Sequence, residues 1–308
     1  MARGVLVATA VAVVLAAAPS SALRLPAAPD CPIFPTNNVW NKRVDSLPVA
    51  ANSDRIIRSI GRGTGLHPDF GSGLYGGGPI GIPFTVVGGA QKKHRVRFTY
   101  ASESDKGPYP IPKGVPIEGG RKSTGDRHAL IVDKSACKLY ELYSLYRRAD
   151  GGWRAGSGAI WDLRSNKLRP RGWTSADAAG LPIFPGLARW DEVKRGRIDH
   201  ALRFTVSQTR RKYIYPARHF ASNLTSKSLP PMGLRVRLKK GFDITGFPLQ
   251  ARIVLKALKR YGMIVADNGS DWYISGAPNS HWDNDALHSL GSVTGDKFVV
   301  VDTSHLRP

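Results

Sequence analysis

Two short, largely apolar runs stand on either side of a polar turn in the middle of the chain. The first run covers residues 127–133, and the second, residues 139–143, is rich in aromatic side chains. Because successive side chains of a strand point to opposite faces, Glu141 shares a face with the apolar Leu139. The pattern predicts a β-hairpin whose carboxylate either faces a cleft or lies on the solvated side.

Similar short runs recur about every ten residues and are separated by turns rich in glycine and proline. They cover residues 83–87, 95–101, 153–163, 199–207, 234–238, 263–267, 271–275 and 297–302. Between the runs 263–267 and 271–275 stands Asn268-Gly269, a strong hairpin signal. The spacing predicts a mainly-β, single-domain β-sandwich, similar to a jelly roll, with long Gly/Pro-rich loops.

Helical periodicity is convincing only late in the chain. Residues 248–261 place apolar side chains at helical spacing, with Pro248 suited to the first turn and Gly262 to the end. Shorter helices are expected at residues 53–60, capped by Ser53, and at 283–290. Residues 174–180 look like one further helical turn, in which Asp177 is the acid of a capping box.

The N-terminus predicts export of the protein. Residues 1–22 combine a positive start at Arg3, an apolar run and a small-residue cleavage site, which is typical of a signal peptide. A membrane anchor is the alternative, although the apolar run is short for a span of roughly 20 residues. We therefore expect a signal peptide at 1–22, an extended N-terminal segment at 23–50 and one mainly-β domain at 51–308. The mature chain is expected to be secreted, extracellular or wall-associated, and free of the membrane.

Two cysteines fit an oxidising compartment. A disulfide between Cys31 and Cys137 would pin the N-terminal segment to the hairpin, and two free buried thiols are the alternative. The bridge would close a loop of about a hundred residues, worth roughly 4–5 kcal/mol in the chain-entropy model. The chain contains neither CxxC nor HExxH, so no metal site is expected, and no phosphate-binding loop points to a cofactor.

The formal charge is strongly positive, at +22 from 45 Lys and Arg against 23 Asp and Glu. Such a charge favours polyanionic partners, although a generally basic, solvated surface would also account for it. Aromatic and basic residues do not alternate as in a nucleic-acid-binding module, so nucleic acid is not expected. An extracellular polysaccharide, neutral or anionic, is the expected partner, and the oligomeric state stays open.

Paired carboxylates are what glycoside hydrolysis requires, one as acid and one as base or nucleophile. The candidates are Glu141, Asp162 and Asp177, and for each of them a salt bridge or turn cap is the alternative. Asp267 and Asp271 are further polar residues of interest. The exposed rings of Trp161 and Trp173 would stack on sugars, although most tryptophans are core residues.

A second set of residues suggests lyase chemistry on an anionic glycan. His128 or His200 would remove a proton, Tyr213 would act as an acid or bind substrate, and arginine would neutralise a substrate carboxylate. The substrate-binding candidates are Arg203, Arg218, His219 and Tyr213. A hydrogen-bonded structural histidine is the alternative for each histidine. The motif GxSxG is absent, so an α/β-hydrolase is not expected.

The run GWTSADAAGLPIFPGLARWDEV, together with GDRHALIVD and HALRFTV, resembles a group of secreted bacterial proteins of unassigned function. The resemblance covers most of the mature chain and brings no activity or catalytic residue. The residues themselves favour a secreted, glycan-active enzyme, first a glycoside hydrolase. A polysaccharide lyase and a non-catalytic cell-wall-binding module are the alternatives.

Overall fold

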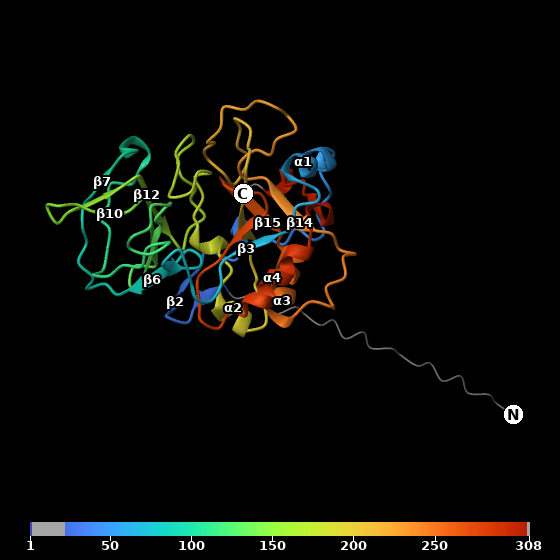
Figure 1. Ribbon diagram of the computed structural model, residues 1–308, viewed down its shortest axis with the longest axis horizontal. Helices are drawn as coiled ribbons and strands as arrows, with labels where there is room; N and C mark the ends of the chain where they lie inside the picture. Colours follow the sequence, from blue (N-terminus) through green and yellow to red (C-terminus); the bar gives the residue numbers. More distant parts are fainter. Residues whose placement is uncertain (2–21, 307–308) are drawn as a thin grey trace.

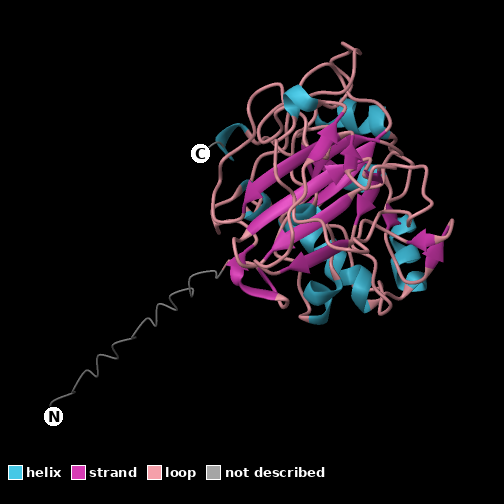
Figure 2. Ribbon diagram, turned by 90° about the vertical axis from the view of Figure 1, so that its left-hand side faces the viewer, coloured by secondary structure: helices cyan, strands magenta, loops and turns pink. Residues whose placement is uncertain are grey.

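The computed structural model describes Met1 and residues 22–306, so the expected signal peptide lies almost wholly outside the described residues (Figure 1). Strands make up 26% of the chain and helices 17%, which confirms the mainly-β prediction. Two large sheets carry the fold, and Figure 2 shows their strands side by side with loops and short helices around them.

The first large sheet is built around the expected hairpin. Its order is β12-β9-β8-β6, formed by β12 (Ser157–Asp162), β9 (Lys138–Tyr143), β8 (Ala129–Asp133) and β6 (Phe84–Val87). The hairpin strands β8 and β9 pair antiparallel, with Leu130 opposite Glu141, whereas β6 runs parallel to β8. The hairpin prediction is confirmed because a local turn joins its two strands directly.

The second large sheet has six strands in the order β17-β14-β15-β13-β16-β3. Their bounds are β17 (Phe298–Val300), β14 (Arg235–Leu238), β15 (Met263–Asn268), β13 (Leu202–Val206), β16 (Tyr273–Ser275) and β3 (His67–Asp69). The expected hairpin through Asn268-Gly269 is wrong. Strand β13 lies between β15 and β16, parallel to the first and antiparallel to the second.

Three small sheets complete the strands. One is β1 (Arg24–Leu25) with β2 (Ala28–Pro32), and another is β4 (Leu74–Tyr75) with β5 (Gly78–Pro79). The third has the order β10-β11-β7, formed by β10 (Tyr146–Arg147), β11 (Trp153–Ala155) and β7 (Val96–Phe98). This last ribbon extends from the hairpin sheet on the left of Figure 1.

The late helix is confirmed as α3 (Leu249–Arg260), which buries its apolar side and contacts β14. Helices α1 (Ser53–Ile60), α2 (Trp190–Lys194) and α4 (Asn284–His288) are shorter. The 3-10 turns are η1 (Val39–Asn41), η2 (Ala101–Glu103), η3 (Phe184–Gly186), η4 (Ser289–Ser292), η5 (Gly295–Lys297) and η6 (Ser304–Leu306).

Two helical expectations need correction. Residues 174–180 form turns and no helix, because the Asp177 carboxylate binds Arg203 instead of capping a helix. Ser53 is the first residue of α1 and does not cap it; its hydroxyl instead accepts a hydrogen bond from the Val300 N–H at 2.9 Å. Both polar side chains serve tertiary contacts that local sequence does not reveal.

Both faces of the hairpin are covered. On one face Leu130, Val132 and Leu139 join the main core, which also contains the second large sheet and α3. On the other face Ile131 and Leu142 join a smaller core with Tyr109, Val115 and the ribbon residue Ala155. Because both faces of the hairpin are buried, its strands contain mostly apolar residues and few polar ones.

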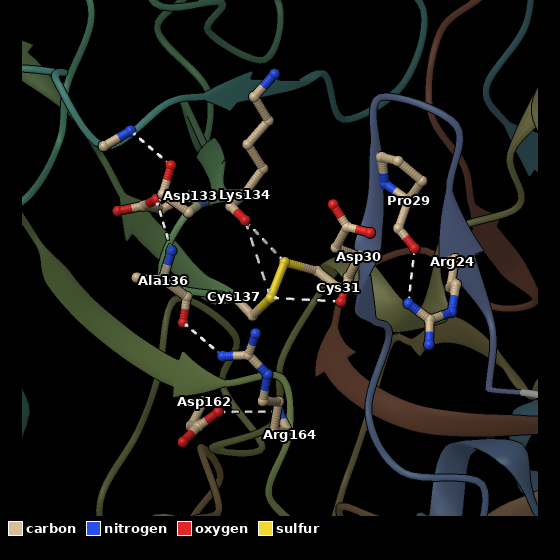
Figure 3. The surroundings of a disulfide bond; sticks show 12 residues. Arg24, Pro29, Asp30, Cys31, Asp133, Lys134, Ala136, Cys137, Asp162 and Arg164 are labelled. Atoms are coloured by element: carbon tan, nitrogen blue, oxygen red, sulfur yellow. Dashed lines mark hydrogen bonds between the residues drawn. A yellow bond between two sulfur atoms is a disulfide. The ribbon is translucent and has the colours of Figure 1, made fainter.

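The N-terminal segment is fixed to the domain at both ends. Cys31 of β2 forms a disulfide with Cys137 of the hairpin turn, with their Cα atoms 5.2 Å apart, which confirms the predicted pairing (Figure 3). Further along, the buried Arg235 guanidinium donates to the carbonyl of Val39 at 2.9 Å and to that of Lys42 at 2.8 Å. Among the described residues, no helix has the length and apolar character to cross a bilayer.

Candidate functional site

A cavity of about 460 Å³ lies where strand ends of the two large sheets meet, and we call it the central pocket. Tyr143 at the end of β9 and Ser157 at the start of β12 form one side, and Asp267 near the end of β15 forms another. The turns at residues 174–178 contribute Asp177 and two hydroxyl groups. The pocket is therefore assembled from segments that lie far apart in the sequence, and carboxyl, hydroxyl and phenol groups form much of its lining.

The base of the central pocket is an ion pair between Arg203 and Asp177. The Arg203 Nε and Nη2 atoms each donate to one carboxylate oxygen of Asp177 at 2.8 Å, and Nη1 donates to the Ser275 hydroxyl at 2.6 Å. Both side chains are almost fully buried. This two-point pairing fixes the orientation of Asp177 because the planar guanidinium matches a carboxylate.

Asp267 is the second carboxyl group at Arg203, and it is held less tightly. Its Oδ2 atom lies 3.4 Å from the Arg203 Nη2 atom, and 22% of its side chain stays exposed. Burial, together with the nearby Asp177 charge, raises the pKa of Asp267 to about 8. At neutral pH Asp267 is therefore a protonated acid that reaches the pocket, beside the carboxyl group of Asp177 that Arg203 binds.

A third acidic group, Glu118, is paired with His128 next to the pocket. The His128 Nδ1 atom lies 2.6 Å from Glu118 Oε2, and Nε2 donates to the Ala176 carbonyl at 2.9 Å. A carbonyl can only accept, so Nε2 carries a proton, and the Glu118 charge raises the pKa of the buried His128 to about 9. His128 is thus an imidazolium that positions Glu118 and has no free nitrogen to act as a base.

Glu118, Asp126 and His128 also offer ligand atoms that all lie within 4.8 Å of one another. Two carboxylates and an imidazole are a donor set suited to a divalent cation. Binding a cation there would require His128 to give up its hydrogen bond to Glu118. The arrangement therefore supports the ion pair at least as well as a metal centre.

The structure brings several predicted site residues to the central pocket. Asp177 and His219 line it, Arg203 forms its base, and His128 lies just behind it. His219 is held by a hydrogen bond from Nδ1 to the Ala178 carbonyl at 2.8 Å. Asp177 belongs to the hydrolase hypothesis and the other three to the lyase hypothesis, so position alone does not separate the two.

Glu141 is not at the pocket. It is fully buried and accepts hydrogen bonds from the Ile183 and Phe184 N–H groups, at 2.9 and 2.8 Å, and from Trp161 Nε1 at 3.1 Å. Burial raises its pKa to about 7, while the three donors favour the ionised form. The expectation that Glu141 faces a cleft or lies on the solvated side is wrong: the buried carboxylate connects the hairpin to residues 183–184.

Asp162 and His200 also serve the structure. Asp162 is exposed at the end of β12, where it accepts a hydrogen bond from the Arg164 N–H at 2.9 Å (Figure 3). His200 is buried between Glu192, at 3.0 Å, and the Ala201 carbonyl, at 2.7 Å. Of the expected group Glu141, Asp162 and Asp177, only Asp177 lines the central pocket, where Asp126 and Asp267 are the other aspartates.

The remaining candidates surround the site without lining it. Trp161 is buried and binds Glu141, and Tyr213 is half-buried and stacks on Phe220. Trp173 lies beneath the Arg169 guanidinium, 5.4 Å from its ring centroid, and Arg218 donates to the Arg169 carbonyl at 2.8 Å. In this structure these four side chains have packing or hydrogen-bonding partners other than a ligand.

Sequence reasoning missed much of the lining, namely Tyr100, Glu103, Asp126, Tyr143, Ser157 and Ser175, as well as the adjacent Glu118. Most of these residues stand in or beside loops or turns. The signal that was available is their position: Asp126 precedes the hairpin, Tyr143 ends it, and Ser157 begins the next strand. Residues at one end of neighbouring strands meet at the same sheet edge.

No protein-family model, curated protein or solved structure matches this chain in the comparisons.

Proposed function

We propose that this protein is a secreted, glycan-active hydrolase whose acid is Asp267 in the central pocket. The observation that carries the proposal is a carboxyl group with a pKa raised to about 8 that remains 22% exposed, in a pocket that the exposed carboxylate of Asp126 also lines. Glycoside hydrolysis needs such a protonated acid together with a second, ionised carboxylate. Export is supported by the sequence of residues 1–22 and by the disulfide.

In this proposal Asp267 gives its proton to the glycosidic oxygen as the bond to the anomeric carbon breaks. Asp126, an exposed residue on the pocket wall, supplies the second carboxylate as base or nucleophile. Water supplies the hydroxyl group that completes hydrolysis, and proton exchange with solvent returns Asp267 to its acid form. Asp177 and Arg203 do not react; burial and the Asp177 charge keep Asp267 protonated, and the Arg203 guanidinium orients both carboxyl groups.

The pocket lining suits a sugar. Ser157, Thr174 and Asn268 present hydroxyl and amide groups, which can hydrogen-bond to ring hydroxyls. Tyr100, which is 53% exposed, offers an aromatic surface at the rim. A volume of about 460 Å³ is in the range of ligand pockets and leaves room for a short stretch of glycan.

The lyase alternative is less well supported. A lyase needs a free base, but both nitrogens of His128 are engaged, and His200 is buried between Glu192 and a backbone carbonyl. A binding module requires no acid with a raised pKa, so Asp267 would have no role in it. Of the three functions, hydrolysis is the one that gives a role to both Asp267 and Asp126 in the central pocket.

The test is a turnover screen of the purified mature chain against neutral and anionic polysaccharides. Reducing ends and ultraviolet absorbance are followed together, because a lyase leaves a new double bond and a hydrolase does not. We expect reducing ends without absorbance, lost in Asp267→Asn and kept in Asp162→Asn. Reducing ends with absorbance, or equal turnover by both variants, would reject the proposal.

A further inference from the structure

We propose that a second cavity, on the far side of the hairpin, binds an acidic sugar group of a glycan. This basic cavity measures about 730 Å³ and lies between the β10–β11 ribbon and the loop at residues 111–121. Lys113, Arg121, Arg127 and Arg147 line it, and among the described residues none of its lining is Asp or Glu. The inference does not depend on the chemistry of the central pocket.

Arg127 is the anchor of the basic cavity. Its side chain is only 6% exposed, with Nε donating to the Leu145 carbonyl at 3.1 Å and Nη1 to the Ser123 carbonyl at 2.8 Å. Within the described chain, its Nη2 atom has no hydrogen-bond partner and its charge has no carboxylate partner. A buried guanidinium that is fixed in place, with one donor edge unused, is suited to an anion.

Arg127 also has an unusual backbone. Its φ angle is 54°, in the left-handed region that non-glycine residues rarely adopt. This conformation stands between Asp126, which lines the central pocket, and His128, which supports it. The chain thus presents consecutive side chains to two different cavities, and strain of this kind clusters at functional sites.

Aromatic rings contact two of the lining arginines, Arg127 and Arg147, and the neighbouring Arg154. The Tyr146 ring lies between Arg127, 4.2 Å from its centroid, and Arg154, at 4.3 Å, and Arg147 stacks on Trp153 at 4.7 Å. Stacking uses the flat faces of the guanidinium groups and leaves their N–H edges available. None of the four lining cations forms a salt bridge in the described part of the chain. Their charges are therefore available to an anionic ligand.

The geometry favours a glycan over a nucleic acid. Two arginines stack on Tyr146 and one stacks on Trp153, which reduces the aromatic surface on which a base could stack. A cavity of about 730 Å³ is large enough for sugar rings as well as for their acidic groups. Carboxylate and phosphate groups share the chemistry that the arginines recognise, so uronic-acid and sugar-phosphate polymers are both candidates.

The test measures binding by calorimetry on the full mature chain at low and physiological salt. The probes are tetragalacturonate, its neutral methyl ester, and a glycerol-phosphate oligomer of similar charge. We expect both acidic probes to bind, with affinity falling as salt rises, and the neutral ester to bind at least roughly tenfold more weakly. The stronger of the two acidic probes then identifies the acidic group. Equal binding of the ester, or no binding of either acid, would overturn the proposal.

Matched variants locate the site. Lys113→Gln/Arg147→Gln removes two exposed charges from the cavity rim, and Lys256→Gln/Arg260→Gln removes two exposed charges from α3. We expect the first pair to weaken acidic binding at least roughly tenfold and the second to change it less than about twofold. Equal losses of affinity in the two double variants would show that net charge, and not the basic cavity, causes the binding. That result would overturn the assignment. A loss in Asp267→Asn, or displacement of the glycan by a tighter-binding single-stranded DNA, would likewise overturn the assignment.

Discussion

Asp177 and Asp267 contact the same guanidinium, but on unequal terms. Asp177 receives two hydrogen bonds from Arg203 at 2.8 Å, whereas Asp267 lies 3.4 Å away through a single oxygen. Asp177 therefore receives most of the stabilisation that Arg203 provides, and burial together with the Asp177 charge raises the pKa of Asp267. This difference in their contacts with Arg203 makes Asp177 a supporting residue and Asp267 the candidate acid.

Replacing Asp267 with Asn should remove the proton that the proposed reaction needs. We expect turnover to fall by roughly 10²–10⁴, the usual contribution of a general acid. In the wild type, turnover should decline as pH rises through about 8, because Asp267 then loses its proton. Initial rates on the substrate from the glycan screen measure both effects. The exposed Asp162→Asn is the control, and an unchanged alkaline decline in Asp267→Asn would contradict the assignment.

Breaking the buried Arg203–Asp177 pair should destabilise the fold strongly. Arg203→Met leaves the Asp177 carboxylate buried without its partner, at an expected cost of about 3–5 kcal/mol in the free energy of unfolding. Arg43→Met, which removes an exposed pair with Asp45, should cost less than about 1 kcal/mol. Urea denaturation measures the free energy of unfolding of the two variants. The double variant Arg203→Met/Asp177→Leu should recover part of the loss, and its failure to do so would locate the cost elsewhere.

Glu141 should behave as a structural residue although it was a catalytic candidate. In Glu141→Gln the amide group would face backbone N–H donors, so we expect a loss of about 1–3 kcal/mol in stability. The rate per folded molecule should stay unchanged. Thermal denaturation and initial rates together test this, and a large loss of rate at normal stability would return Glu141 to the reaction.

The fold should weaken at alkaline pH. The pKa of His128 is about 9 in the folded protein against 6.5 for a free imidazole, so its contribution is complete below pH 6.5 and lost as pH rises through 9. Asp267 adds to this loss at lower pH, because its pKa is raised from 3.8 to about 8 and the stability that its proton contributes declines as pH rises between these values. Melting temperatures between pH 6 and 9.5 should therefore fall. In His128→Gln the slope above pH 6.5 should flatten, and an unaltered slope would exclude His128 as its source.

Removing the disulfide should act mainly through the unfolded chain. Cys31 and Cys137 are 106 residues apart, so Cys31→Ser/Cys137→Ser should lower the free energy of unfolding by about 2–5 kcal/mol. The slope of that free energy against urea should rise, because the unfolded chain becomes more extended. A steady slope with a large loss of stability would instead point to damage in the folded state.

The sequence was informative wherever structure is decided locally. The hairpin, α3 and the cysteine pairing follow from a turn, a helical period and a cysteine count, and all three are present in the structure. The Asn268-Gly269 hairpin failed because β13, some sixty residues earlier, inserts between β15 and β16. A strong turn signal predicts that the chain reverses direction. It does not predict that the two strands on either side of the turn pair with each other.

The central pocket could be predicted only in part, for the same reason. Arg203 and Asp177 drew attention as polar residues in apolar surroundings, but their pairing joins positions 26 residues apart. Glu118 and Asp126 stand in turns whose sequence looks like ordinary solvated loop. Glu141 attracted interest as a carboxylate on an apolar strand, a pattern that a saturated structural carboxylate produces equally well.

The dipeptide Asp126-Arg127 gives the two cavities a shared wall. A movement of this backbone would displace a lining residue of each cavity at once. If an anion drawn to Arg127 shifts the position of Asp126, a ligand at Asp126 must shift the affinity at Arg127 by the same factor, since coupling between binding sites is reciprocal. A long acidic chain that reached both cavities would gain further from the high local concentration of its second end.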